Sequence, residues 1–135
     1  MIVRICEGNV LEAAAEALLV PVDEGGRDDR VNRVRVWGNV GLQARRRWGE
    51  DWDTVADDLG FPIPMGTASE AETEDPIPFK YVIAVSMLDH LNRFTGPEYS
   101  RLVRSAFRSA IEIAASWHLK TIATPVLQGG WRMKA

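Results

Sequence analysis

The stretch Ile2–Asp23, IVRICEGNVLEAAAEALLVPVD, decides the predicted fold. Its apolar and β-branched ends predict two strands, and its middle predicts a turn followed by a short Ala-rich helix. Gly8 suits a tight turn, and Asn9 followed three residues later by Glu12 matches a capping box at a helix start. The stretch therefore predicts a β-α-β unit whose helix begins where the first strand ends. Such a helix N-terminus is a common place to hold a nucleotide, although the same unit also occurs without a ligand.

The composition limits the class of protein. The chain has 135 residues, of which 46% are hydrophobic and 26% are charged, so one domain with a hydrophobic core is expected. The net charge of −3 gives no reason to expect binding to nucleic acid or to a membrane. The lone Cys6 cannot form an internal disulfide, and no signal peptide or membrane-spanning run is evident, so we expect a cytoplasmic protein. His90 and His118 lie far apart in sequence, and we expect no metal and no cofactor.

The rest of the chain predicts alternating helices and strands. Residues 31–36 are compatible with either a strand or a first helical turn. The clearest strand is FKYVIAVSML, because its nearly continuous apolar run is typical of a strand that is buried on both faces. The later elements are, in chain order, a helix at 39–48, a helix at 50–59, an edge strand at 67–73, a strand at 79–88, a long helix from the capping box Thr95–Glu98 to about Trp117, and a strand at 120–126. This order predicts an α/β fold with helices on both faces of a sheet.

Three segments resemble the macro domain family. The segment GNVLEAAAEALLVPVD resembles the opening of the family, in which a Gly-Asp-Ile/Val-Thr turn precedes a helix and a strand that ends in an Asn-rich loop. KYVIAVS resembles the central strand of the family, and HLKTIATPVLQGGWRM resembles a later strand with its glycine loop. The resemblance implies a single macro-like domain over residues 1–135, with a three-layer α/β/α sandwich around a mixed sheet. It also implies ADP-ribose or a related nucleotide metabolite as the ligand.

The resemblance also implies a set of ligand-binding residues. Asn9 stands where the family usually has an Asp that hydrogen-bonds the adenine amino group, and Val10 stands next to the base. Asp23 falls near the Asn-rich run, and two pairs of glycines correspond to the two phosphate loops, the second followed by an aromatic residue that would pack on the distal ribose. The residues assigned in this way are Asn9, Val10, Asp23, Gly25, Gly26, Gly129, Gly130 and Trp131.

This chain departs from the family pattern at several points. Pro21 lies in the Asn-rich run, and it has neither an N–H group nor a side-chain donor for ribose recognition. The sequence RDDRVN stands in place of the usual triple-glycine loop. The helix and final strand that normally follow the second phosphate loop have no counterpart before Ala135. Either the sheet is rebuilt with fewer strands, or a partner chain supplies the missing strand. Because an unfilled sheet position would leave a bare edge, we expect a homodimer in which a partner completes the sheet.

Three functions are compatible with this pattern. The main hypothesis is a module that binds ADP-ribose or a related nucleotide. The second is a degenerate structural or oligomerising domain without a ligand, which the departures favour. The third is a hydrolase that acts on ADP-ribosyl esters or ADP-ribose phosphates, in which Asp23 or Asp28 would activate a water. No pair of residues with clear acid–base geometry is visible in the sequence, so whether the protein is an enzyme is left open.

Overall fold

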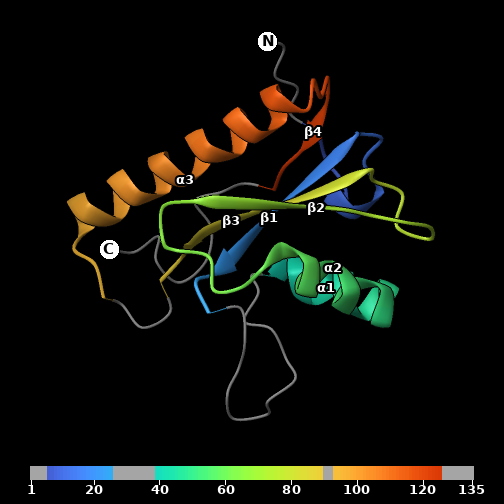
Figure 1. Ribbon diagram of the computed structural model, residues 1–135, viewed down its shortest axis with the longest axis horizontal. Coiled ribbons are helices and arrows are strands. Elements are labelled where there is room, and N and C mark those ends of the chain that lie inside the picture. Colours follow the sequence, from blue (N-terminus) through green and yellow to red (C-terminus); the bar gives the residue numbers. More distant parts are fainter. Residues whose placement is uncertain (1–5, 26–38, 90–92, 126–135) are drawn as a thin grey trace.

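The structure, a computed structural model, describes residues 6–25, 39–89 and 93–125. In chain order, its elements are the 3-10 helix η1 (Val10–Glu12), β1 (Ala17–Asp23), α1 (Asn39–Trp48), α2 (Glu50–Leu59), β2 (Ala68–Glu72), β3 (Tyr81–Leu88), α3 (Gly96–Ser116) and β4 (Ile122–Ala123). Four strands form a sheet in the order β2-β3-β1-β4. Helix α3 covers one face of the sheet, and α1 and α2 cover the other (Figure 1). The predicted three-layer α/β/α sandwich around a mixed sheet is therefore confirmed.

The pairing of β1 with β3 forms the centre of the sheet. The two strands are parallel, with Ala17 opposite Tyr81 and Val22 opposite Ser86. Every residue of β1 is buried, as is every residue of β3 except the first and the last. A strand that is covered on both faces favours apolar residues at nearly every position, which explains the nearly continuous apolar runs in the sequence. The antiparallel β2 and the parallel β4 flank this pair.

The side chains of β1 are shared between two hydrophobic cores. Leu18, Val20 and Val22 face the layer of α1 and α2, where Trp52 belongs to the same core. Leu19 points the other way, into the core beneath α3. This division follows from the two-residue period of a strand. The central strand therefore holds both helix layers in place.

Three alanines allow α3 to lie close to the sheet. Ala106, Ala110 and Ala114 recur every four residues and are buried along the face of the helix that meets the sheet. The helix starts at the predicted capping box, in which Thr95 Oγ1 donates to Glu98 Oε1 (2.8 Å) and accepts from Glu98 N–H (3.3 Å). Among the described helices, even this one is not long and apolar enough to cross a membrane.

The prediction of an Ala-rich helix after Asn9 is wrong. A single 3-10 turn, Val10–Glu12, occupies this place, and Ala13 returns to extended backbone. A few residues of high helix propensity are not enough to form a stable helix alone. Here Leu11 is anchored in the core, and the chain then extends to reach the start of β1.

The remaining elements agree with the prediction with one exception. The strands β2 and β3 and the helices α1 and α2 begin and end within two residues of their predicted bounds. The exception is β4, which is limited to Ile122–Ala123 where the sequence predicted 120–126. The predicted strand at 2–5 and the ambiguous segment 31–36 lie outside the described residues.

Glu16 joins the starts of three strands at the amino end of the sheet. Its carbonyl oxygen accepts hydrogen bonds from the N–H groups of Lys80 (2.8 Å) and Tyr81 (3.2 Å), where β3 begins. Its carboxylate accepts from the N–H of Lys120 (2.7 Å), just before β4, and lies 3.8 Å from the Lys80 ammonium. The hydrogen bond from Lys120 is the main cause that lowers the pKa of the Glu16 carboxyl, and the charge of Lys80 contributes in the same direction while desolvation opposes both.

Replacing Ala110 by Leu should destabilise the fold, because Ala110 is fully buried between α3 and the sheet. Overpacking of this kind costs about 1–3 kcal/mol. Ala115→Leu is the matched control, since Ala115 is exposed on the same helix and should change stability by less than about 0.5 kcal/mol. Urea unfolding of both variants measures the difference. Equal stabilities would contradict the close contact of α3 with the sheet.

Glu16→Gln should reduce the loss of stability in acid. Because the pKa of Glu16 is lowered in the folded state, the ionised carboxylate stabilises the fold above its unfolded-state pKa of about 4.3. This contribution is lost as the pH falls through the lower folded-state pKa. The urea midpoints of wild type and Glu16→Gln should therefore differ most near neutral pH and converge in acid. Glu74→Gln, in the exposed turn before β3, should follow the wild-type curve; a constant offset between Glu16→Gln and wild type at all pH values would contradict the linkage.

Candidate functional site

The carboxyl ends of β1 and β3 lie at the same edge of the sheet, because the two strands are parallel. β1 ends at Asp23 and is followed by Glu24, and β3 is followed by Asp89. In open α/β sheets, ligands bind in the space beyond the carboxyl ends of the strands. We refer to Asp23–Gly25 together with Asp89 and Arg93 as the carboxyl edge.

Asp23 fixes the turn that follows β1. Its side chain is 7% exposed, and Oδ1 accepts a hydrogen bond from the N–H of Gly25 at 2.9 Å. An aspartate that bonds the backbone two residues ahead forms an Asx turn, which directs the chain away from the strand. The next residue, Glu24, is tied to the connection between α2 and β2: its carbonyl accepts from Ile63 N–H at 2.8 Å, and Oε1 accepts from Met65 N–H at 3.4 Å.

Asp89 plays a similar part after β3. It is only 2% exposed, and its two carboxylate oxygens accept from the N–H groups of Arg93 (3.0 Å) and Phe94 (3.1 Å). A buried carboxylate is costly unless it is hydrogen-bonded, and these main-chain donors offset that cost. Asp89 thereby holds the two ends of the loop that leads from β3 into α3.

Arg93 connects the two halves of the carboxyl edge. Its Nη2 lies 3.1 Å from Glu24 Oε2, and its Nε lies 3.8 Å from Asp89 Oδ1. The guanidinium carbon also lies 5.1 Å from the centre of the Phe94 ring, within the range of a cation–π contact. The side chain remains 42% exposed, so this guanidinium is both oriented and accessible. The chain after β1 is thus joined to the chain after β3 by one basic side chain.

The charges at the carboxyl edge determine which chemical groups it suits. Among the described residues, the guanidinium of Arg93 contacts the carboxylates of Glu24 and Asp89, and a third carboxylate, of Asp23, lies at the end of β1. Such an environment favours hydrogen-bond donors such as hydroxyl and amino groups, and it repels phosphates that are not neutralised by other groups. Over the described part of the chain, no group of three or more His, Cys, Asp or Glu side chains is arranged to hold a metal ion.

The sequence-predicted residues fall into three groups. Asp23 and Gly25 lie at the carboxyl edge. Asn9 instead caps η1, where its Oδ1 accepts from Leu11 N–H at 3.0 Å, and Val10 packs against the core on the side of α1 and α2. The η1 turn is further tied to the last turn of α1 by an ion pair between Glu12 and Arg47, which is 3.2 Å long. The contact of Asn9 with adenine stays a prediction. The residues Gly26, Asp28, His90, Gly129, Gly130 and Trp131 lie outside the described part of the chain.

Three residues of the carboxyl edge were not predicted from the sequence as site residues: Glu24, Asp89 and Arg93. The two acids were detectable in principle, because each lies directly after an apolar strand of a parallel pair. Arg93 gave no such signal, since its contact with Glu24 joins positions that are far apart in the chain. Only the parallel pairing of β1 with β3 brings these positions together.

Asp89→Ala should destabilise the fold by about 1–3 kcal/mol, because it leaves the N–H groups of Arg93 and Phe94 without their carboxylate acceptor. Asp58→Ala, an exposed position of α2, serves as the control and should change stability by less than about 0.5 kcal/mol. Chemical denaturation compares the two. If both variants unfolded at the wild-type midpoint, Asp89 would not be holding the loop.

Comparisons with known proteins support the fold described above. No family model and no curated protein matches the sequence. Among solved structures, the macrodomain of Thermus aquaticus DarG matches with a TM-score of 0.63 and 20% identity, covering 91% of this chain and 75% of that chain. The macrodomain of Mycobacterium tuberculosis DarG matches with a TM-score of 0.63 and 18% identity, covering 89% and 72%.

A third match is the alphavirus structure described as P23pro-zbd, with a TM-score of 0.67 and 19% identity. It covers 95% of this chain but only 16% of that much longer one. Identities near 20% are informative about the fold alone. The overall backbone arrangement is similar to that of two macrodomains over about nine tenths of this chain. The fold implied by the resemblance is therefore confirmed: this chain has the macrodomain fold.

Proposed function

We propose that this domain binds ADP-ribose or a related nucleotide metabolite at the carboxyl edge of β1 and β3. The observation that carries the proposal is the position of Asp23, a buried carboxylate at the end of the central strand of a macrodomain-like sheet. Ligands of open α/β folds lie beyond such strand ends. The likeness to two macrodomains supports a nucleotide-type ligand over an unrelated one.

The chemistry of the edge suggests how the ligand lies. Carboxylates accept hydrogen bonds from the hydroxyl groups of a ribose or from the amino group of adenine, and these bonds are stronger than those between neutral groups. Asp23 and Glu24 therefore suit the nucleoside portion. The phosphates need N–H donors, which the backbone around Gly25, Gly26, Gly129 and Gly130 would supply in this proposal.

A structural role without a ligand is the second candidate. The ion pairs of Arg93 with Glu24 and Asp89 favour it, because they satisfy much of the carboxyl edge from within the protein. Pro21, buried in β1, favours it too, since it offers no donor to a ribose. Hydrolysis has less support, because Asp23 already holds the turn after β1.

Calorimetric titration with ADP-ribose tests the proposal. We expect saturable binding, and we expect Asp23→Ala to weaken it by about 10- to 150-fold, because a hydrogen bond to a charged group contributes about 1.5–3 kcal/mol. Glu74→Ala is the control: it removes an exposed carboxylate in the turn before β3 and should leave the affinity unchanged. Circular dichroism of both variants confirms that they are folded.

The other results have distinct meanings. Absence of heat at millimolar ADP-ribose, with folded protein, would reject binding and favour the structural role. Binding by wild type with the same affinity in Asp23→Ala would keep the ligand but remove Asp23 from its site. Release of ribose-containing products during the titration would favour the hydrolase.

A further inference from the structure

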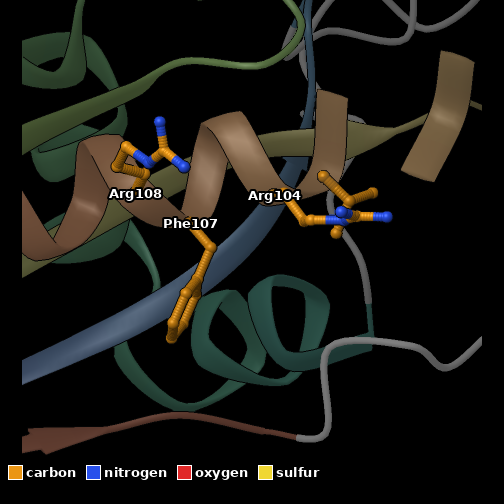
Figure 2. Close-up of a pocket in the computed structure, with 4 residues that line it drawn as sticks. Arg104, Phe107 and Arg108 are labelled. Carbon is orange, nitrogen blue, oxygen red and sulfur yellow. The ribbon is translucent and has the colours of Figure 1, made fainter. Parts of the chain in front are cut away.

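The outer face of α3 carries an exposed aromatic ring among arginines. Phe107 is 36% exposed and lines a shallow depression together with Val103, Arg104 and Arg108. Figure 2 shows the Phe107 ring projecting from α3 between the positions of Arg104 and Arg108 along the helix. Arg101 continues the row of arginines one turn earlier. We call Arg101, Arg104, Phe107 and Arg108 the basic face of α3.

The arginines of this face are not neutralised within the described part of the protein. Arg101, Arg104 and Arg108 are exposed, and none of them forms an ion pair there. They are spaced three and four residues apart, so they lie on one side of the helix and repel one another. The chain as a whole is acidic, with a net charge of −3. An anionic partner would relieve this repulsion.

A surface of complementary charge exists on the same chain. Helix α2 has five acidic residues and no basic residue within its ten positions. Glu50, Asp51 and Asp58 are exposed, and Asp51 and Asp58 are seven positions apart, as are Arg101 and Arg108. Seven residues make about two helical turns, or about 10 Å, so the two acids and the two arginines repeat with the same spacing. We call Glu50, Asp51 and Asp58 the acidic face of α2.

The lengths of the two helix faces are also compatible. Glu98 and Glu112 bound the basic face, and the interval between them spans about 21 Å, enough for the ten residues of α2, which span about 15 Å. Leu42 is an exposed hydrophobic residue on α1, the helix that contacts α2. Helix α1 is a less suitable partner for the arginines of α3, because it exposes the positive charge of Arg46.

From these observations we propose that the basic face of α3 binds the acidic face of α2 of a second copy of this chain. The two faces cannot meet within one molecule, because α3 and α2 lie on opposite sides of the sheet (Figure 1). The contact is therefore heterologous, because it joins two different surfaces. After each copy is added, one end of the assembly still has a basic face available and the other end has an acidic face. It differs from the dimer expected from the sequence, in which a partner strand completes the sheet. It is also independent of the proposed ligand, which lies at the carboxyl edge.

Sedimentation velocity of the full chain tests this association. We expect the sedimentation coefficient to rise with protein concentration at about 0.02 M salt and to stay constant at about 0.5 M, where charges more than a few ångströms apart are screened. A wild-type protein that stays monomeric at low salt and high concentration would overturn the proposal.

Charge reversal identifies the two faces. Arg104→Glu combined with Arg108→Glu, and separately Asp51→Lys combined with Asp58→Lys, should each weaken self-association by at least about tenfold, because like charges then face each other. An equimolar mixture of the two variants should associate again, since each reversed face meets a reversed partner. Glu74→Lys changes an exposed charge that lies on neither helix and should associate like the wild type.

Two results would overturn the choice of partner. Loss of association in the α3 variant with full association in the α2 variant would assign the basic face to another occupant. Failure of the mixture to associate, with both variants folded by circular dichroism, would reject the direct contact of the two faces.

Discussion

The parallel pairing of β1 with β3 is the constraint on which the rest of the structure depends. It aligns Ala17 with Tyr81 and Val22 with Ser86, and so brings segments about sixty positions apart into contact. Because helices cover both faces of the pair, all of its side chains except those of the first and last residues of β3 are buried, and they divide between two cores. The charged residues of the pair are consequently found at the ends of the strands, and the one buried hydroxyl within β3, of Ser86, donates a hydrogen bond to the Ile63 carbonyl.

The two ends of the strands use their polar residues differently. At the amino end, Glu16 bonds the main chain of the neighbouring strands and stabilises the start of the sheet. At the carboxyl end, Asp23 and Asp89 hold the chain as it leaves each strand, and Arg93 joins the two exits. Both ends therefore hold a cation beside a carboxylate. The carboxyl edge is the candidate site because ligands of open α/β sheets bind beyond the carboxyl ends of the strands.

The sequence predicted those elements whose signal is local. The apolar runs of β1 and β3 are one example, because burial on both faces favours apolar residues along the strand. The capping box of α3 is another, because the N–H groups of the first helical turn need a side-chain acceptor. The helix predicted for the Ala-rich segment after Asn9 does not form, because the burial of Leu11 in the core outweighs helix propensity there. Arg93 was missed because its partner Glu24 is close only in the folded chain.

The carboxyl edge and the basic face of α3 are connected through the loop that Asp89 closes. Asp89 bonds the main chain at Arg93 and Phe94, and α3 begins immediately afterwards, at Gly96. Tyr99, in the first turn of α3, donates a hydrogen bond from its hydroxyl to the carbonyl of Met87 in β3, at 2.9 Å. The start of α3 is thus positioned by the same residues that shape the carboxyl edge. The side-chain ion pair of Arg93 with Asp89 is separate from these main-chain bonds, so the anchor of α3 does not depend on what the guanidinium contacts.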